Sequence, residues 1–133
     1  MKYALFVAST VLVVAACGDK NKPTPTPALT GGKGGGAVLN VYPQHHGQPV
    51  DSCTIYIKYA ANDLPTAGYD DSARCPAAND NVGVATFTGL KPGNYYLFGL
   101  GYDPAFGVAV DGGLPYNFSQ EDTFTVLLPV GEE

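Results

Sequence analysis

The sequence contains no tryptophan, only two histidines, three cysteines and seven basic residues. A protein that stacks sugars on aromatic rings must therefore rely here on its tyrosines, of which there are nine. From residue 37 onward, only Lys58, Arg74 and Lys91 face eleven acidic residues. Phosphate backbones and anionic lipids are bound by clustered cations, so we expect neither nucleic acid as a partner nor attachment to lipid by charge.

Motifs that mark common enzyme classes are also missing. The sequence has no nucleophile elbow, phosphate-binding loop, paired-carboxylate motif or HExxH. We therefore expect a non-enzymatic protein without a cofactor. A metal-dependent hydrolase that uses His45, His46 and nearby acids stays open as an alternative.

One long apolar run is present, and it lies at the start of the chain. Met1-Lys2 supplies a positive charge, and Tyr3 to Val14 is almost uninterruptedly apolar, which is typical of a signal peptide. The sixteen residues before Cys17 are fewer than the about 20 apolar residues that a spanning helix needs. We predict that residues 1–16 are a cleaved signal.

The run closes as Val14-Ala15-Ala16-Cys17, which resembles the lipobox of bacterial lipoproteins. The resemblance implies that Cys17 Sγ receives a diacylglyceryl group and that the freed amine is acylated with a fatty acid such as palmitate. Two or three chains hold a protein durably, since each buried CH₂ contributes about 0.8 kcal/mol. The alternative is an ordinary secretory signal that leaves Cys17 as a thiol. Gly18 lacks the aspartate that retains some lipoproteins at an inner membrane, which favours the outer membrane.

Residues 17–36 are predicted to be the lipidated cysteine followed by a flexible tether. The prolines favour a stiff polyproline II conformation, and the glycines that follow favour a flexible swivel segment. The prolines are Pro23, Pro25 and Pro27. Fully extended, the nineteen residues from Gly18 to Gly36 reach about 60 Å. The folded domain is expected to occupy residues 37–133.

Short β-rich runs separated by Gly, Pro, Asn and Asp fill this domain and predict a β-sandwich. No window offers a helical stripe apart from the signal. The run Asn94–Tyr102 is apolar or aromatic on both faces, which predicts a central strand covered on both sides. The predicted strands are Ala37–Tyr42, Cys53–Tyr59, Val82–Thr88, Asn94–Tyr102, Gly107–Val110, Tyr116–Phe118 and Thr123–Val130.

The segment Gly83–Leu97 reads as a strand, a turn at Pro92-Gly93 and a second strand, with Leu90 tucked under the connection. Its G-x-A-x-F-x-x-L-x-P-G-x-Y pattern resembles transthyretin-like, carboxypeptidase-regulatory-like and Cna-B-type sandwiches. The stretches 108–115 and 125–130 further resemble prealbumin-like lipoproteins of the Bacteroidetes type. The resemblance implies an all-β, antiparallel Greek-key sandwich of about seven strands.

Two properties of these families are not expected here. The predicted first strand, Ala37–Tyr42, has no lysine for the Lys–Asn crosslink of Cna-B-type domains. The transthyretin-like hydrolases of purine breakdown end in Tyr-Arg-Gly-Ser, whereas this chain ends Val-Gly-Glu-Glu.

After lipidation of Cys17, Cys53 and Cys75 remain as an even pair in an oxidising compartment, which predicts a disulfide. A bridge over a loop of this length is worth about 3 kcal/mol. The alternative is two buried free thiols.

Several residues are weaker candidates for a site. Adjacent His45 and His46 on an extended chain would point to opposite sides, which is poor geometry for a shared metal. The oxygen ligands of a loop Ca²⁺ site are offered by Asp70, Asp71, Asn79, Asp80 and Asn81, without EF-hand spacing. Ser72 in Asp71-Ser72-Ala73 resembles a Bacteroidetes O-glycosylation acceptor. The candidates for stacking sugars are Tyr69, Tyr102 and Tyr116.

Together these features predict a lipid-anchored, non-enzymatic envelope module that binds a protein or a glycan. Its support is architectural, because a rigid sandwich on a tether presents its loops to a partner. A structural accessory of an envelope complex is the other non-enzymatic alternative. Tyrosines such as Tyr69, Tyr102 and Tyr116 more often pack in the core or at a sheet edge than contact a ligand.

Overall fold

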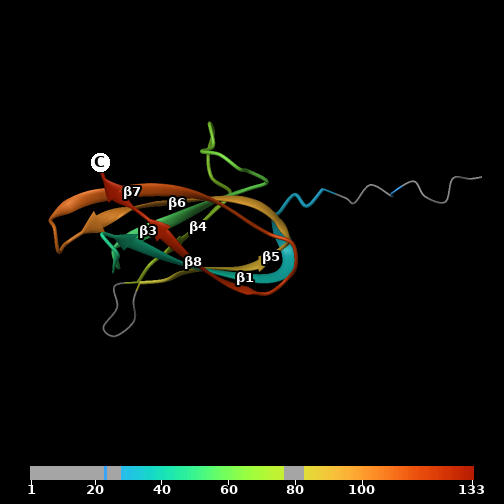
Figure 1. Cartoon of the computed structure of the whole chain (residues 1–133), viewed down its shortest axis with the longest axis horizontal. Helices are drawn as coiled ribbons and strands as arrows, with labels where there is room; N and C mark the ends of the chain where they lie inside the picture. The colour runs from blue at the N-terminus through green and yellow to red at the C-terminus, as the bar shows by residue number, and fades with distance from the viewer. Residues whose placement is uncertain (1–22, 24–27, 77–82) are drawn as a thin grey trace, which may run out of the picture.

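The computed structural model describes residues 23, 28–76 and 83–133, and these form two β-sheets packed face to face (Figure 1). The first sheet contains β1 (Lys33–His45), β2 (Gln48–Pro49), β5 (Ala85–Leu90) and β8 (Thr123–Pro129). The second has the order β4 (Asp71–Arg74), β3 (Cys53–Tyr59), β6 (Gly93–Asp103), β7 (Val108–Phe118) and β9 (Gly131–Glu132). The all-β sandwich is therefore confirmed. In the described part of the chain, no helix is long and apolar enough to cross a membrane.

The predicted strands match the observed ones closely for β3, β6 and β8 and less well for β1, β5 and β7. β3 has the predicted bounds, and β6 is one residue longer at each end. The predicted strands 107–110 and 116–118 both fall in the single strand β7, except for Gly107, which lies in the preceding turn. Val82 lies outside the described residues. The sequence does not predict β2, β4 and β9, because short runs of polar residues carry no hydrophobic alternation.

One strand pair departs from the expected antiparallel arrangement. β8 runs parallel to β1, with Val38 opposite Thr123 and Gln44 opposite Pro129, whereas the other strand pairs of the described chain are antiparallel. The chain leaves β7 in the second sheet and crosses to the first, so β8 is not joined to β1 by a hairpin. Only strands joined by a tight hairpin must be antiparallel, so β8 can run parallel to β1.

The core lies between the two sheets and is built from alternate residues of each long strand. Leu39 and Val41 of β1 face Ile55 and Ile57 of β3, and all four are fully buried. Leu90 is also fully buried, and Gly93 has a φ of 155°. These two residues confirm the prediction for the Pro92-Gly93 connection, which takes the chain from β5 in one sheet to β6 in the other.

The prediction that β6 is covered on both faces is wrong. Tyr95 and Leu97 are completely buried on the inner face, but Leu100 and Tyr102 on the outer face are 41% and 49% exposed. Phe98 on the same face is half-buried. The strand is central in its sheet, but no layer of the described chain covers the outer face of that sheet. The apolar residues on this face of β6 therefore form a partly exposed aromatic surface.

The glycines expected to form a swivel are instead part of the folded domain. β1 begins at Lys33, four residues before the predicted start at Ala37. Gly31 N–H donates to the Pro92 carbonyl at 3.2 Å, and Lys91 N–H donates to the Gly32 carbonyl at 2.8 Å. A Cβ on Gly93 would collide with the backbone of Gly31. Glycine thus allows two backbones to approach closely here, rather than making the chain flexible.

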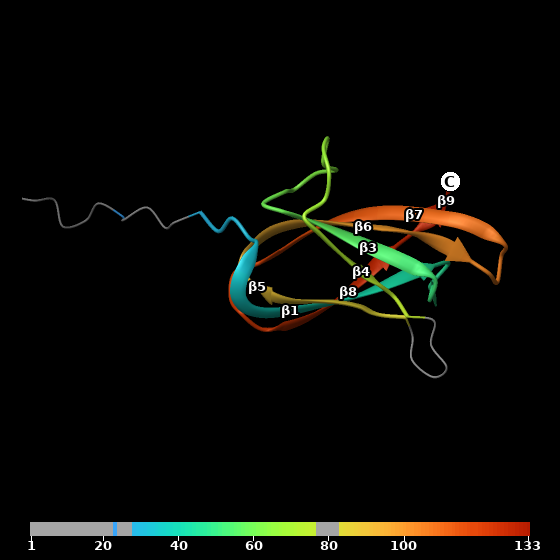
Figure 2. The ribbon, with the colours of Figure 1, turned by 180° about the vertical axis from the view of Figure 1, so that it is seen from behind.

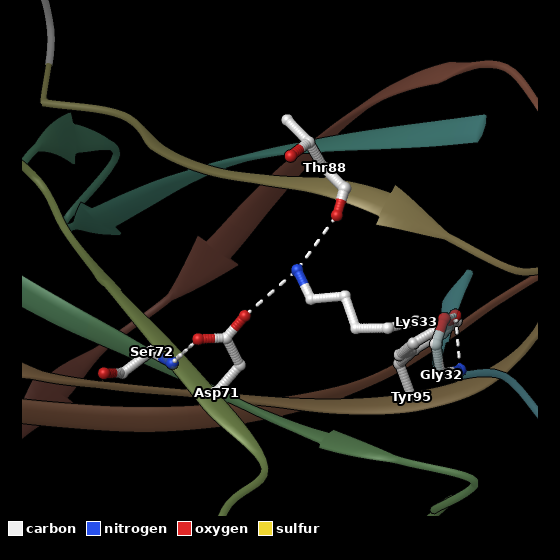
Figure 3. Close-up of polar contacts among 6 residues, drawn as sticks. All are labelled: Gly32, Lys33, Asp71, Ser72, Thr88 and Tyr95. Carbon is white, nitrogen blue, oxygen red and sulfur yellow. Dashed lines mark hydrogen bonds and ion pairs between the residues drawn. The ribbon is translucent and has the colours of Figure 1, made fainter. Parts of the chain in front are cut away.

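The side chains of Tyr95 and Lys33 hold the start of β1 and the residue before it against both sheets (Figure 3). The buried Tyr95 hydroxyl accepts a hydrogen bond from Gly32 N–H at 2.9 Å. Lys33 Nζ donates to the Thr88 carbonyl of β5 at 2.9 Å and pairs with Asp71 of β4 at 3.1 Å, so it bridges the edges of the two sheets. The first strand therefore does contain a lysine, but its amine is paired with a carboxylate and about half exposed.

Candidate functional site

A cluster of polar and aromatic side chains gathers at the end of the sandwich opposite to where the chain enters. β1 starts at the entry end and finishes at His45, and the β6–β7 turn and the C-terminus lie beside that finish (Figures 1 and 2). His46 and Gly47 form a two-residue turn into β2, with φ values of 49° and 75°. Positive φ at both positions is typical of the hairpin turns that match the twist of strands.

This turn overturns the prediction that the two histidines point apart. Because His46 leaves the extended conformation, its ring folds back over that of His45, and the ring centroids lie 4.1 Å apart. Phe106 from the β6–β7 turn contacts both rings, at centroid distances of 5.3 Å and 5.1 Å. The cluster therefore combines two imidazoles with an exposed phenyl ring from a distant part of the chain.

Asp103 holds His45 in one orientation. Its Oδ2 lies 2.8 Å from His45 Nδ1, and its Oδ1 accepts a hydrogen bond from Ala105 N–H at 2.9 Å. His45 and Asp103 are only 2% and 5% exposed. The hydrogen bond from His45, with that of Ala105 N–H, lowers the pKa of Asp103, so the carboxylate is ionised and Nδ1 carries the proton that it donates.

The C-terminal residues complete this cluster. β9 pairs with β7, and Val130 N–H donates to the Gln44 carbonyl at 2.9 Å, which draws the chain end against β1. Glu132 Oε1 then lies 3.9 Å from His46 Nε2. The sequence draws attention to neither Asp103 nor Glu132, because each reaches the histidines only through the packing of the second sheet against the first.

The three tyrosines predicted to stack sugars do not form one cluster. Tyr116 packs against the core beside Phe118 and Phe124. Tyr102 is exposed at the far end of β6. Tyr69 lies on the outer face of the second sheet, where it stacks on Phe98 with the ring planes 17° apart.

Tyr69 also lines a pocket of about 440 Å³ together with Tyr56, Asp70, Asp71 and Ser72. Tyr59 N–H and Lys58 both bond to Asp70, and the Tyr59 bond is the main cause of its lowered pKa. The Asp71 carboxylate is partly desolvated, but hydrogen bonds from Lys33 and from Ser72 N–H outweigh burial and lower its pKa as well. Both acids therefore present ionised oxygens to the pocket wall.

The predicted Ca²⁺ ligands are only partly visible. Asp70 and Asp71 are paired with the amines of Lys58 and Lys33. The other three ligands proposed for this loop, Asn79, Asp80 and Asn81, lie outside the described residues, so the Ca²⁺ site stays a prediction.

The candidate glycosylation acceptor lies on an edge strand. Ser72 is exposed on β4, where it is opposite Tyr56 of β3. Its glycosylation stays a prediction.

Cys53 and Cys75 are both buried and carry free thiols in the structure. Cys75 N–H donates to the Cys53 carbonyl at 2.9 Å, and both residues line the same pocket. Burial is the main cause that raises the pKa of Cys53 to about 11 and that of Cys75 to about 12, with neighbouring acidic groups adding to it. Both thiols are therefore protonated and poor nucleophiles at neutral pH.

Comparison with protein-family models, with curated proteins and with solved structures finds no match to this chain. The two packed sheets by themselves define the class of protein, which is a β-sandwich.

Proposed function

We propose that the chain is a non-enzymatic lipoprotein of the bacterial cell envelope, anchored through acylated Cys17 and built to bind an extracytoplasmic partner. The signal-like run and the lipobox-like Val14–Cys17 support the anchor. The outer membrane is its proposed location, since Gly18 follows the cysteine. Incorporation of labelled palmitate at Cys17 tests the anchor directly.

The arrangement of β1 supports a tethered module that faces away from the membrane. If the tether runs only from Gly18 to Thr30, its thirteen residues reach at most about 45 Å. β1 then leads from the tethered end to His45, a distance of up to about 40 Å for its thirteen residues. The histidine end of the sandwich is accordingly the end farthest from the lipid.

The pocket beside Tyr69 is the observation that favours a glycan over a protein as the partner. Sugars are bound by an aromatic ring together with a few convergent polar groups, and this pocket offers Tyr69, two ionised carboxylates and the Ser72 hydroxyl. A glycan is therefore the proposed ligand. Tyr69 and Tyr56, which line the pocket, lie on the outer face of the second sheet.

Replacing Tyr69 by alanine is expected to weaken glycan binding about tenfold, which equals about 1.4 kcal/mol. Tyr102→Ala is the matched control, because Tyr102 is exposed but does not line the pocket. Binding would be measured on a glycan array and by polysaccharide pull-down. If no glycan is retained while crosslinking in cells captures a protein, the partner is a protein instead. Co-purification with an envelope complex and no soluble ligand would indicate a structural accessory.

The fold family proposed for the domain is the transthyretin-like or prealbumin-like sandwich with Greek-key connections. Its support is the strand, turn and strand of Gly83–Leu97, with buried Leu90 and a positive φ at Gly93. The family carries no function with it, because one sandwich architecture hosts many activities.

We also propose that Cys53 and Cys75 form a disulfide in the oxidising envelope. The backbone hydrogen bond between them and their position at the end of the β3–β4 ladder support it, because opposed residues of paired strands have Cα atoms about 5.5 Å apart, within disulfide range. Oxidised protein is expected to lose about 2 Da relative to reduced protein and to gain about 3 kcal/mol of stability.

The measurement is non-reducing peptide mapping together with urea unfolding of both redox forms. In the reduced form, the rise of the Cys53 pKa from 9.0 to about 11 lowers its thiolate fraction about 100-fold, so alkylation should be slow at neutral pH. Cys53→Ser with Cys75→Ser should match the stability of the reduced form. Native protein from the envelope with two rapidly alkylated cysteines would contradict the bridge.

A further inference from the structure

We propose that His45, His46 and Glu132 form a binding site for a divalent transition metal ion of the Zn²⁺ class, with Asp103 orienting His45. Each of the three side chains offers one ligand atom, and these atoms all lie within 4.8 Å of one another. Two imidazoles and one carboxylate are a donor set that Zn²⁺ accepts. This site is independent of the lipid anchor and of the Tyr69 pocket.

The strongest argument is the hydrogen bond that supports His45. Metal-binding histidines typically donate their second ring N–H to a carboxylate, which fixes the tautomer and raises the basicity of the free nitrogen. The 2.8 Å contact between His45 Nδ1 and Asp103 has this geometry, and a bond from Ala105 N–H holds the other carboxylate oxygen. A histidine held in this way through Nδ1 offers Nε2 to an ion, here from a nearly fully buried imidazole.

A second argument is the difference in hydrogen bonding between the two ring nitrogens of His45. Among the described residues, Nδ1 is bonded to Asp103, and no hydrogen bond engages Nε2. No fully enclosed side-chain nitrogen or oxygen of the described chain lacks a bonding partner, so Nε2 must keep a small contact with solvent. Nε2 is therefore the His45 nitrogen that is proposed to join the exposed His46 and Glu132 around an ion.

The three ligand atoms, which lie within 4.8 Å of one another, must move closer together on binding. Tetrahedral coordination at about 2.0–2.1 Å places neighbouring ligand atoms about 3.3 Å apart. The His46 Nε2 to Glu132 Oε1 distance of 3.9 Å is slightly longer, and these two side chains are 61% and 58% exposed. They are free to rotate toward an ion, whereas His45 is already fixed. Three protein ligands leave a fourth position open for water or for a group from a partner.

Phe106 gives the site a partly apolar wall. Its ring lies against both imidazoles and is 54% exposed, so it shields one side of the cluster from water. Apolar surroundings strengthen the attraction between a cation and a carboxylate, because the local dielectric falls.

The test is calorimetric titration of Zn²⁺ into the full, untagged chain, purified in detergent and stripped with EDTA. One ion per chain is expected, together with a rise in melting temperature. His46→Ala and Glu132→Gln should each weaken binding at least tenfold, and Asp103→Asn should weaken it about 10- to 100-fold. Co²⁺ in place of Zn²⁺ should give the visible absorption of a four-coordinate site, and this absorption should be lost in His46→Ala.

The controls separate this site from other ligands. Glu121→Gln, an exposed glutamate at the other end of the sandwich beside Gly36, should leave the affinity unchanged. Cys53→Ser with Cys75→Ser should also leave it unchanged, which excludes thiolate ligands. His46 and Glu132 are exposed, so their variants are expected to fold, and the metal-free melting temperature checks this.

The proposal is overturned if the chain shows no saturable Zn²⁺ binding up to about 1 mM, the weak limit of specific affinity. It is equally overturned if the His46→Ala, Glu132→Gln double variant binds as tightly as the unchanged chain. Failure of either kind leaves the palmitate and glycan experiments unaffected, because neither depends on these residues.

Discussion

Replacing Cys17 by alanine is expected to abolish palmitate labelling and to move the chain from the membrane fraction to the soluble fraction. The acyl chains on this one sulfur and its amine are the proposed attachment, and each buried CH₂ contributes about 0.8 kcal/mol. The acidic domain cannot compensate, since anionic headgroups repel it. The expected change is therefore close to complete.

Fractionation of cells grown with labelled palmitate measures both effects. Cys53→Ala is the matched control, because it removes a different cysteine and should leave the label and the membrane fraction unchanged. Mass spectrometry of the mature N-terminus adds an independent readout. A Cys17→Ala chain that still sediments with membranes, or a wild-type Cys17 without lipid, would refute the anchor.

Replacing Tyr95 by alanine is expected to destabilise the domain by about 3–5 kcal/mol, the range for truncating a large aromatic side chain in a core. Its ring is fully buried and stacks on Phe118 at a centroid distance of 5.3 Å with planes 6° apart. It also meets Tyr59 edge to face at 5.9 Å. Urea unfolding of the wild type and the variant measures the loss.

The hydroxyl of Tyr95 has a separate role, which Tyr95→Phe isolates. This variant keeps the ring but removes the acceptor for Gly32 N–H and the donor to the Lys91 carbonyl. We expect a loss of about 1–2 kcal/mol and faster hydrogen exchange at Gly32. Tyr102→Phe, on the exposed end of β6, should change neither. Unaltered exchange at Gly32 in Tyr95→Phe would mean that the glycine segment is held by other contacts.

The local sequence pattern is sufficient for the strands whose two faces differ in polarity. Ile55 and Ile57 alternate with Thr54 and Lys58, and this alternation predicts β3 with its observed bounds. The Pro92-Gly93 turn is equally clear, because its residues prescribe a backbone shape that few others adopt. The β-sandwich class follows from the spacing of such runs.

The pattern fails where a residue's neighbours come from distant parts of the chain. The glycine-rich residues 31–36 resemble a linker by composition, and only their contacts with the backbone of Leu90–Gly93 make them a strand and the segment that leads into it. The His46-Gly47 turn carries a local signal, a glycine at the second position of a two-residue hairpin, but its ring contacts depend on Phe106 and Glu132.

The sequence alone determined the β-sandwich class, the acidic character of the domain and the prediction of a lipid anchor, because these depend on composition, periodicity and short motifs. The tertiary structure decided which side chains meet. Asp103 fixes His45, Glu132 approaches His46, and Tyr69 stacks on Phe98, each across a large separation in the chain. The packing of one sheet on the other brings the His45–Asp103 and His46–Glu132 pairs together, and the segment between β3 and β4 brings Tyr69 onto β6. No local pattern encodes contacts between segments that far apart in the chain.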